Sequence, residues 1–188
     1  MSLEADDVPQ PLAIDHYASD AHRLDADAFK ARHGDAFLVR KGPLEAGRRP
    51  LRPQKTMLIE GHKVDAALTS KGPAPSTSLV VIPVQHTGRS PYPSMITVGR
   101  TRNNDVVLND VVVSKFHAFF KEENGKLLLL DADSRNGTFI DGTPVPKNKA
   151  GAAIVAAPGS KIKFGLLDFW LLDAEGLRDL ARRSCPST

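Results

Sequence analysis

Short apolar runs separated by small polar clusters fill the chain from residue 79 to residue 173. The runs are rich in branched and aromatic side chains and are bounded by Asn, Asp, Gly, Ser or Pro, a pattern typical of β-strands. We expect strands at 79–85, 95–100, 105–108, 111–113, 117–120, 126–130 and 166–173, with further short segments at 151–158 and 160–165. Many short strands with frequent turn signals predict an all-β fold, a two-sheet antiparallel β-sandwich.

Two local signals refine this prediction. Asn124 and Gly125 separate two apolar runs, and this pair favours a two-residue hairpin turn in which both residues take positive φ. Pro83 has no amide hydrogen to donate, so the run that contains it should be an edge strand or should end there.

The first 78 residues have a different, mixed character. Leu24 and Phe29 recur among alanines and charges over 21–33, which predicts a short helix that stops at Gly34. Strand-like runs follow at 36–42 and 57–59, residues 43–56 are basic and proline-rich, and 70–78 have the composition of a linker. Because so few residues would build only a marginal core, we expect 1–78 to be a mixed α/β extension docked on a sandwich of 79–173. Residues 174–188 should form a short helical tail.

Composition narrows the class of protein. The chain is 41% apolar and its net charge is +3, values that do not require nucleic acid as a partner. Its one cysteine, Cys185, cannot form an internal disulfide, and the six histidines are too scattered for a metal framework. No apolar stretch approaches the roughly 20 residues needed to span a bilayer, and the acidic N-terminus does not resemble a secretory signal. We therefore expect a cytoplasmic protein without membrane contact, metal or cofactor.

Polar side chains with phosphate-binding chemistry gather in the connections between the predicted strands. The cationic donors are Arg100, Lys115 and Arg135, and the neutral donors are Ser114, Asn136 and Thr138. A dianionic phosphate accepts several charge-assisted hydrogen bonds at once, and the planar fork of arginine can hold two of its oxygens. The set predicts an anion site on one rim of loops.

The same residues resemble the forkhead-associated (FHA) domain family over roughly residues 79–173. The resemblance rests on residues that stand in the family's order and at its usual spacing: Gly99, Arg100, Ser114, His117, Ser134, Asn136, Gly137 and Thr138. It implies a non-enzymatic module that binds phosphothreonine peptides. The implied partners are proteins that a Ser/Thr kinase has phosphorylated on threonine.

The resemblance also implies a role for each site residue. Arg100 and Ser114 would bind the phosphate, with a looser assignment for Lys115, and Asn136 would contact the peptide backbone. Arg135 departs from the smaller polar residue common at that position and would either touch phosphate or peptide or merely cover the rim. The implied structural supports of the site are Gly99, His117, Gly137 and Thr138.

Two catalytic or metal readings fit the sequence poorly. Ser114 and His117 with Asp105 or Asp131 suggest a hydrolase triad, but the G-x-S-x-G turn is missing. Residues 131–142 begin like a calcium loop, yet arginine, asparagine and glycine stand where a ligand, a turn glycine and a bidentate glutamate are needed.

Three binding alternatives stay open. A scaffold could bind partners without phosphate, and Arg48, Arg49, Arg52 and Lys55 could attract nucleic acid, although the pattern favours a solvated, extended linker for this arm. Thr77 or Thr87, once phosphorylated, could also occupy the chain's own rim.

Overall fold

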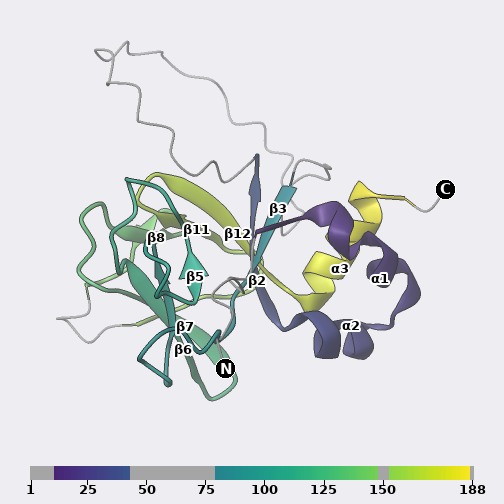
Figure 1. The fold of residues 1–188 in the computed structure, drawn as a ribbon, viewed down its shortest axis with the longest axis horizontal. Helices are drawn as coiled ribbons and strands as arrows, with labels where there is room; N and C mark the ends of the chain where they lie inside the picture. Colours follow the sequence, from purple (N-terminus) through teal and green to yellow (C-terminus); the bar gives the residue numbers. More distant parts are fainter. Residues whose placement is uncertain (1–10, 43–78, 148–152, 187–188) are drawn as a thin grey trace, which may run out of the picture.

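The structure is a computed structural model that describes residues 11–42, 79–147 and 153–186, and it consists of two β-sheets with helices along one side (Figure 1). The strands of the seven-stranded sheet are, in spatial order, β1 (Leu12–Ala13), β3 (Leu79–Pro83), β2 (Ala36–Lys41), β12 (Leu167–Asp173), β11 (Lys161–Phe164), β8 (Thr138–Ile140) and β9 (Thr143–Pro144). The five-stranded sheet has the order β10 (Ile154–Val155), β7 (Lys126–Asp131), β6 (Ala118–Glu123), β4 (Ile96–Gly99) and β5 (Val106–Val107).

This architecture confirms the expected two-sheet β-sandwich. The strand pairs are antiparallel except for β4 and β5, which run parallel over a two-residue contact. The hairpin between β6 and β7 turns at Asn124 and Gly125, with φ values of 53° and 70°, as the sequence predicted. Pro83 ends β3 and so needs no amide hydrogen for the sheet. Residues 111–113, expected to be a strand, instead form a turn between β5 and β6.

One apolar core lies between the two sheets. Alternate residues of a strand point to opposite faces, so Phe169 and Leu171 of β12 enter this core, where Phe120 of β6 and Phe164 of β11 also pack. Leu172, the next residue of β12, belongs to a second cluster on the other face of the same sheet. The part of the seven-stranded sheet around β12 is therefore buried on both faces.

Helices cover that other face. They are η1 (Ile14–Tyr17), α1 (Ala18–Arg23), α2 (Ala26–His33) and α3 (Ala174–Ser184), and Figure 1 shows them gathered beside β2, β3 and β12. The single helix expected over 21–33 is divided because Leu24 is extended and the Asp25 side chain caps α2 by accepting a hydrogen bond from the Ala28 amide at 2.8 Å. None of the helices in these described ranges is long and apolar enough to cross a bilayer.

Polar contacts join α3 to the C-terminal end of α1. Arg178 of α3 donates two hydrogen bonds to the Leu24 carbonyl at 3.0 and 2.8 Å, and Arg182 donates one to the Ala21 carbonyl at 2.6 Å. These bonds satisfy the last carbonyl groups of α1, which have no partner within their own helix. The bonds thereby hold α1, near the start of the described residues, against α3, near their end.

Strands from both sides of residue 78 build the seven-stranded sheet. β2 lies between β3 and β12, with Leu38 opposite Ile82 on one side and opposite Leu171 on the other. Phe37 and Val39 are fully buried under the helices. The basic arm at 43–56, the strand expected at 57–59, the linker at 70–78 and Thr77 lie outside the described residues.

A fragment that begins at residue 79 should therefore fail to unfold cooperatively. Without β2 and the first helices, Leu79, Val81 and Leu172 lose their cover, at about 1.5–3 kcal/mol for each side chain. That loss is a large part of the roughly 5–15 kcal/mol that stabilises a typical domain. Thermal unfolding followed by circular dichroism, compared with a chain that begins at residue 11, measures the difference. Equal melting temperatures would contradict the expectation.

Candidate anion-binding site

Three loops at one end of the sandwich enclose a small pocket of about 240 Å³. They follow β4, precede β6, and connect β7 to β8. Five of the residues that line the pocket are the five predicted binding residues, and the other three form an apolar wall: Arg100, Ser114, Lys115, Arg135, Asn136, and the wall of Val111, Val112 and Val113. The fold thus brings together all five side chains from positions up to 36 residues apart.

Gly99 lets the first two loops touch. A Cβ atom at this position would lie 2.2 Å from the Lys115 carbonyl oxygen and 2.8 Å from Nδ2 of Asn104, closer than real Cβ atoms approach. Asn104 and Thr101 both donate hydrogen bonds to that carbonyl, at 2.8 and 2.9 Å. The Arg100 amide donates to the Ser114 carbonyl at 3.0 Å. Arg100 and Lys115 are therefore held on two joined pieces of backbone.

His117 links the second loop to the third. Its ring is fully buried, Nδ1 accepts a hydrogen bond from the Ser114 amide at 2.9 Å, and Nε2 lies 3.1 Å from the Gly137 carbonyl oxygen. A carbonyl can only accept, so Nε2 carries the hydrogen and the ring is neutral. Burial lowers the pKa of His117 below its usual value, although the Gly137 carbonyl and the charge of Asp131 partly oppose this.

A buried carboxylate shapes the third loop. Asp131, at the end of β7, accepts hydrogen bonds from the Ser134 amide at 2.8 Å, the Ser134 hydroxyl at 2.7 Å and the Thr138 hydroxyl at 2.6 Å. The Ser134 hydroxyl in turn accepts from the Gly137 amide at 3.0 Å. Gly137 has a φ of 78°, a conformation that suits glycine. These bonds set the direction in which Arg135 and Asn136 leave the loop.

Hydrogen bonds within the protein use some polar atoms of Ser114 and Asn136 and leave others available to a ligand. The Ser114 hydroxyl accepts a hydrogen bond from the Arg135 amide at 3.1 Å, so its own hydrogen is left to donate. Nδ2 of Asn136 donates to the Val112 carbonyl at 2.7 Å, which fixes the amide plane. Among the described residues, Oδ1 of Asn136 accepts no hydrogen bond and is left as an acceptor.

The charge of the pocket is positive and uncompensated. Within the described ranges, no carboxylate forms a salt bridge with Arg100, Lys115 or Arg135. The nearby Lys147, by contrast, pairs with Asp133 at 3.0 Å and donates to the Ser134 carbonyl at 3.2 Å, so it supports the loop. A pocket with three unpaired cations and a hydroxyl donor is chemically suited to an anion.

The geometry does not assemble a hydrolase triad. Nδ1 of His117 is occupied by the backbone amide of Ser114, not by its hydroxyl, so the ring is not placed to deprotonate that oxygen. Asp105 is committed elsewhere, because it accepts from the amides and hydroxyls of Thr87 and Thr97 at 2.9 Å. Burial would raise the pKa of Asp105, but these hydrogen bonds lower it below its usual value.

Sequence reasoning missed several supports of the pocket. Asn104 was not singled out, although its Nδ2 atom joins the loops, and Asp131 was considered only as a triad or calcium residue. The spacing of Asp131 and Ser134, where a carboxylate accepts from the amide three residues later, is a signal that could have revealed this turn. The valine wall could not be foreseen because residues 111–113 appeared strand-like.

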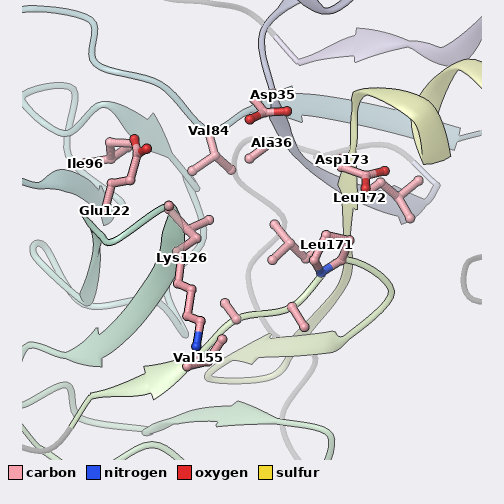
Figure 2. A pocket seen from close by; sticks show the side chains of 15 residues that line it. Asp35, Ala36, Val84, Ile96, Glu122, Lys126, Val155, Leu171, Leu172 and Asp173 are labelled. Atoms are coloured by element: carbon pink, nitrogen blue, oxygen red, sulfur yellow. The ribbon is translucent and has the colours of Figure 1, made fainter. Parts of the chain in front are cut away.

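A larger pocket, of about 450 Å³, lies at the opposite end of β6 and β12 (Figure 2). Its lining is mostly aliphatic, including Val84 and Leu171, and its charged residues are Asp35, Glu122, Lys126 and Asp173. With one ammonium group against three carboxylates, this pocket is poorly suited to a phosphate, so size alone does not identify the functional site. The smaller pocket has the chemistry that the sequence predicted.

The part of the chain that contains the small pocket matches a known protein family. Residues 96–165 match the family model described as FHA domain. The glycogen accumulation regulator GarA of Mycolicibacterium smegmatis is 35% identical over 69 residues, which are 37% of this chain and 40% of that protein. The oxoglutarate dehydrogenase inhibitor of Corynebacterium diphtheriae is 34% identical over 82 residues, which are 44% of this chain and 52% of that protein. The chain thus aligns with about half or less of each relative.

Solved structures align over a similar share of the chain. The N-terminal FHA domain from S. cerevisiae Rad53p, in complex with a phosphothreonine peptide, is 28% identical and covers 45% of this chain and 72% of that one, with a TM-score of 0.38. Mycobacterium tuberculosis EmbR, in complex with a low-affinity phosphopeptide, is 23% identical and covers 42% of this chain and 20% of that one, also with a TM-score of 0.38.

Replacing Gly99 by alanine should destabilise the protein by about 1–3 kcal/mol, because the added methyl group collides with backbone and nothing nearby is free to move. Amide NMR signals of Asn104 and Lys115 should shift. Gly142→Ala is a control for the same substitution in open space: its φ of 80° favours glycine, unlike the backbone of Gly99, but its Cβ would meet nothing within 4 Å; it should cost about 1 kcal/mol through the backbone alone and leave those signals in place. Unchanged stability of Gly99→Ala would contradict the packing argument.

The free energy of unfolding should decrease as the pH is lowered through the range where free histidine titrates. His117 has a lowered pKa in the folded state, so below about pH 6.5 the unfolded chain binds a proton that the folded chain refuses. The free energy of unfolding therefore declines as the pH drops from about 6.5 towards the folded pKa of His117, and this group makes no pH-dependent contribution above about pH 6.5. Titration of the His117 ring by NMR checks the cause, and a midpoint at or above the ordinary value would refute it.

Proposed function

We propose that residues 96–165, which match the family model described as FHA domain, form a phosphothreonine-dependent recognition module that binds partners of Ser/Thr kinase signalling. One observation carries the proposal. The five residues predicted to contact a phosphopeptide line a single pocket, and its cations have no carboxylate partner among the described residues. The roles assigned below to single residues are part of the proposal.

The phosphate would be held by three kinds of donor. Arg100 presents a planar fork that can bind two oxygens, Lys115 supplies a compact charge, and Ser114 has a hydroxyl hydrogen to donate. The phosphate carries a charge of about −1.5 to −2 near neutral pH, so charged donors provide most of the affinity. Because hydrogen bonds already fix the backbone of the loops, little ordering would accompany binding.

Recognition of the residue and its neighbours would use the rest of the pocket. The valine wall, in which Val113 is almost completely buried, offers an apolar recess for the methyl group that distinguishes phosphothreonine from phosphoserine. Asn136 would accept a hydrogen bond from a peptide amide through Oδ1, while Nδ2 stays on the Val112 carbonyl. Arg135 would contact the phosphate or a flanking side chain.

The proposed role is binding rather than catalysis. His117 is neutral, buried and committed to two backbone groups, so it serves as a support. A regulator and an inhibitor are among the relatives that align with this chain, and both names fit proteins that act by binding. The partners would be threonine-phosphorylated proteins in the cytoplasm, and no cofactor is needed.

Replacing Arg100 by alanine should weaken phosphopeptide binding by about 1.5–3 kcal/mol, or roughly 10- to 150-fold. The measurement is fluorescence anisotropy with peptides selected from an oriented phosphothreonine library. Arg102→Ala is the matched control, because Arg102 lies in the same loop and is exposed but does not line the pocket. Equal affinities of wild type and Arg100→Ala would sink the assignment.

Phosphoserine and unphosphorylated versions of the selected peptides separate this function from its rivals. We expect phosphothreonine to bind more tightly than phosphoserine, and the unphosphorylated peptide not to bind. Binding that survives phosphatase treatment of the partner would instead indicate a phosphate-independent scaffold.

A further inference from the structure

Three aromatic rings form a stacked row beside the proposed phosphate pocket. Tyr92 and Phe116 lie with ring centroids 5.9 Å apart and planes at 16°, and Phe116 and Phe119 lie 6.0 Å apart at 21°. Tyr92 is 48% exposed and Phe116 is 36% exposed. Large apolar side chains are normally buried, so two neighbouring exposed rings invite an explanation. We call these three residues the aromatic row.

The aromatic row lies on the outer face of the five-stranded sheet. Phe119 alternates along β6 with Ala118 and Phe120, which enter the core between the sheets. Phe119 and its cross-strand neighbour Leu130 are buried but belong to neither apolar core. The helices cover the other sheet (Figure 1), and the exposed part of the row is Tyr92 and Phe116, because Phe119 is only 3% exposed, stacks on Phe116 and has Nζ of Lys121 5.9 Å from its ring centroid.

The row is continuous with the pocket and is held rigidly. Phe116 directly follows Lys115, which lines the pocket and whose carbonyl accepts hydrogen bonds from Thr101 and Asn104. Tyr92 stands between two prolines, which restrict its backbone. A ligand would therefore lose little of its binding energy to ordering this surface.

We propose that the aromatic row binds an extended apolar segment of the same phosphorylated partner, adjacent in sequence to its phosphothreonine. This inference rests on the proposed function. Alternate side chains of an extended strand are about 6.6 Å apart on one face, close to the 5.9 Å between the two exposed rings, Tyr92 and Phe116. A segment with aromatic or branched residues at alternate positions would place one side chain on Tyr92 and the next on Phe116.

The small area of the row favours this occupant over a second copy of the chain. A stable protein interface buries about 800 Å² on each partner, whereas an aromatic side chain offers about 150–250 Å² and all three residues of the row are already more than half covered. So small a surface is too weak to hold a partner alone. Beside a phosphate anchor, it adds affinity and selects the flanking sequence.

The test uses the full chain and fluorescence anisotropy. The probes are the best short phosphothreonine peptide from an oriented library, and the same peptide extended on its N-terminal or C-terminal side by alternating Phe and Ser or by Ser alone. One of the Phe-containing extensions should bind about tenfold more tightly than its all-Ser counterpart, the gain expected from aromatic contacts. In Tyr92→Ser and in Phe116→Ser, this gain should fall below about twofold.

Controls separate the possible failures. Both variants should bind the unextended phosphopeptide as the wild type does, and Val155→Ser, an equally exposed apolar residue on β10, should keep the full gain. Tight phosphopeptide binding without any gain overturns this inference and leaves the proposed function intact. No phosphate-dependent binding overturns both. Concentration-dependent dimers in sedimentation that Tyr92→Ser abolishes would assign the row to a second copy and refute the proposal.

Discussion

Burying a hydrogen-bonding side chain is unfavourable unless its partners are in place, and this protein concentrates such side chains at one end of the sandwich. Among the described residues, all of the buried polar ones except Asp20 belong to the loops around the anion pocket or to strand ends beside them: Thr97, Asn104, Asp105, His117, Asp131, Ser134 and Thr138. Asp131 folds the third loop, His117 joins it to the second, and Asn104 joins the second to the first. These hydrogen bonds fix the three loops whose side chains line the pocket.

The network explains why three cations can lie together at the pocket although no carboxylate of the described residues forms a salt bridge with them. Arg100, Lys115 and Arg135 point from backbone segments whose positions are already fixed, so their mutual repulsion does not open the loops. Burial of apolar side chains offsets this repulsion, both in the core between the sheets and in the second cluster, where residues of β2 and α3 are buried. Stability and recognition are thus separated in space, with helices on one sheet and ligand chemistry at the ends of the strands.

How far the sequence predicted this arrangement depends on how local each signal is. Asn124 and Gly125 specify their turn by themselves, and the spaced polar clusters identified the five residues that line the pocket. Residues 111–113 misled because three consecutive valines suit a strand, yet the Asp110 side chain accepts from the Val112 amide and turns the chain. The place of β2 between β3 and β12 was not predictable, because it depends on pairing across more than 100 residues. The longer-range hydrogen bonds of Asp131 and Asn104 could not be predicted either, because they depend on the folded conformation of the loops.

The central claim is that the small cationic pocket, and not the larger apolar one, is the recognition site. Amide NMR spectra of the full chain, recorded during titration with a phosphothreonine peptide selected from an oriented library, test it most directly. We predict the largest shifts at Arg100, Ser114, Lys115, Arg135 and Asn136, with none from the unphosphorylated peptide. Shifts centred on Ala36, Leu127 and Leu171 of the apolar pocket, or equal shifts from both peptides, would contradict the account.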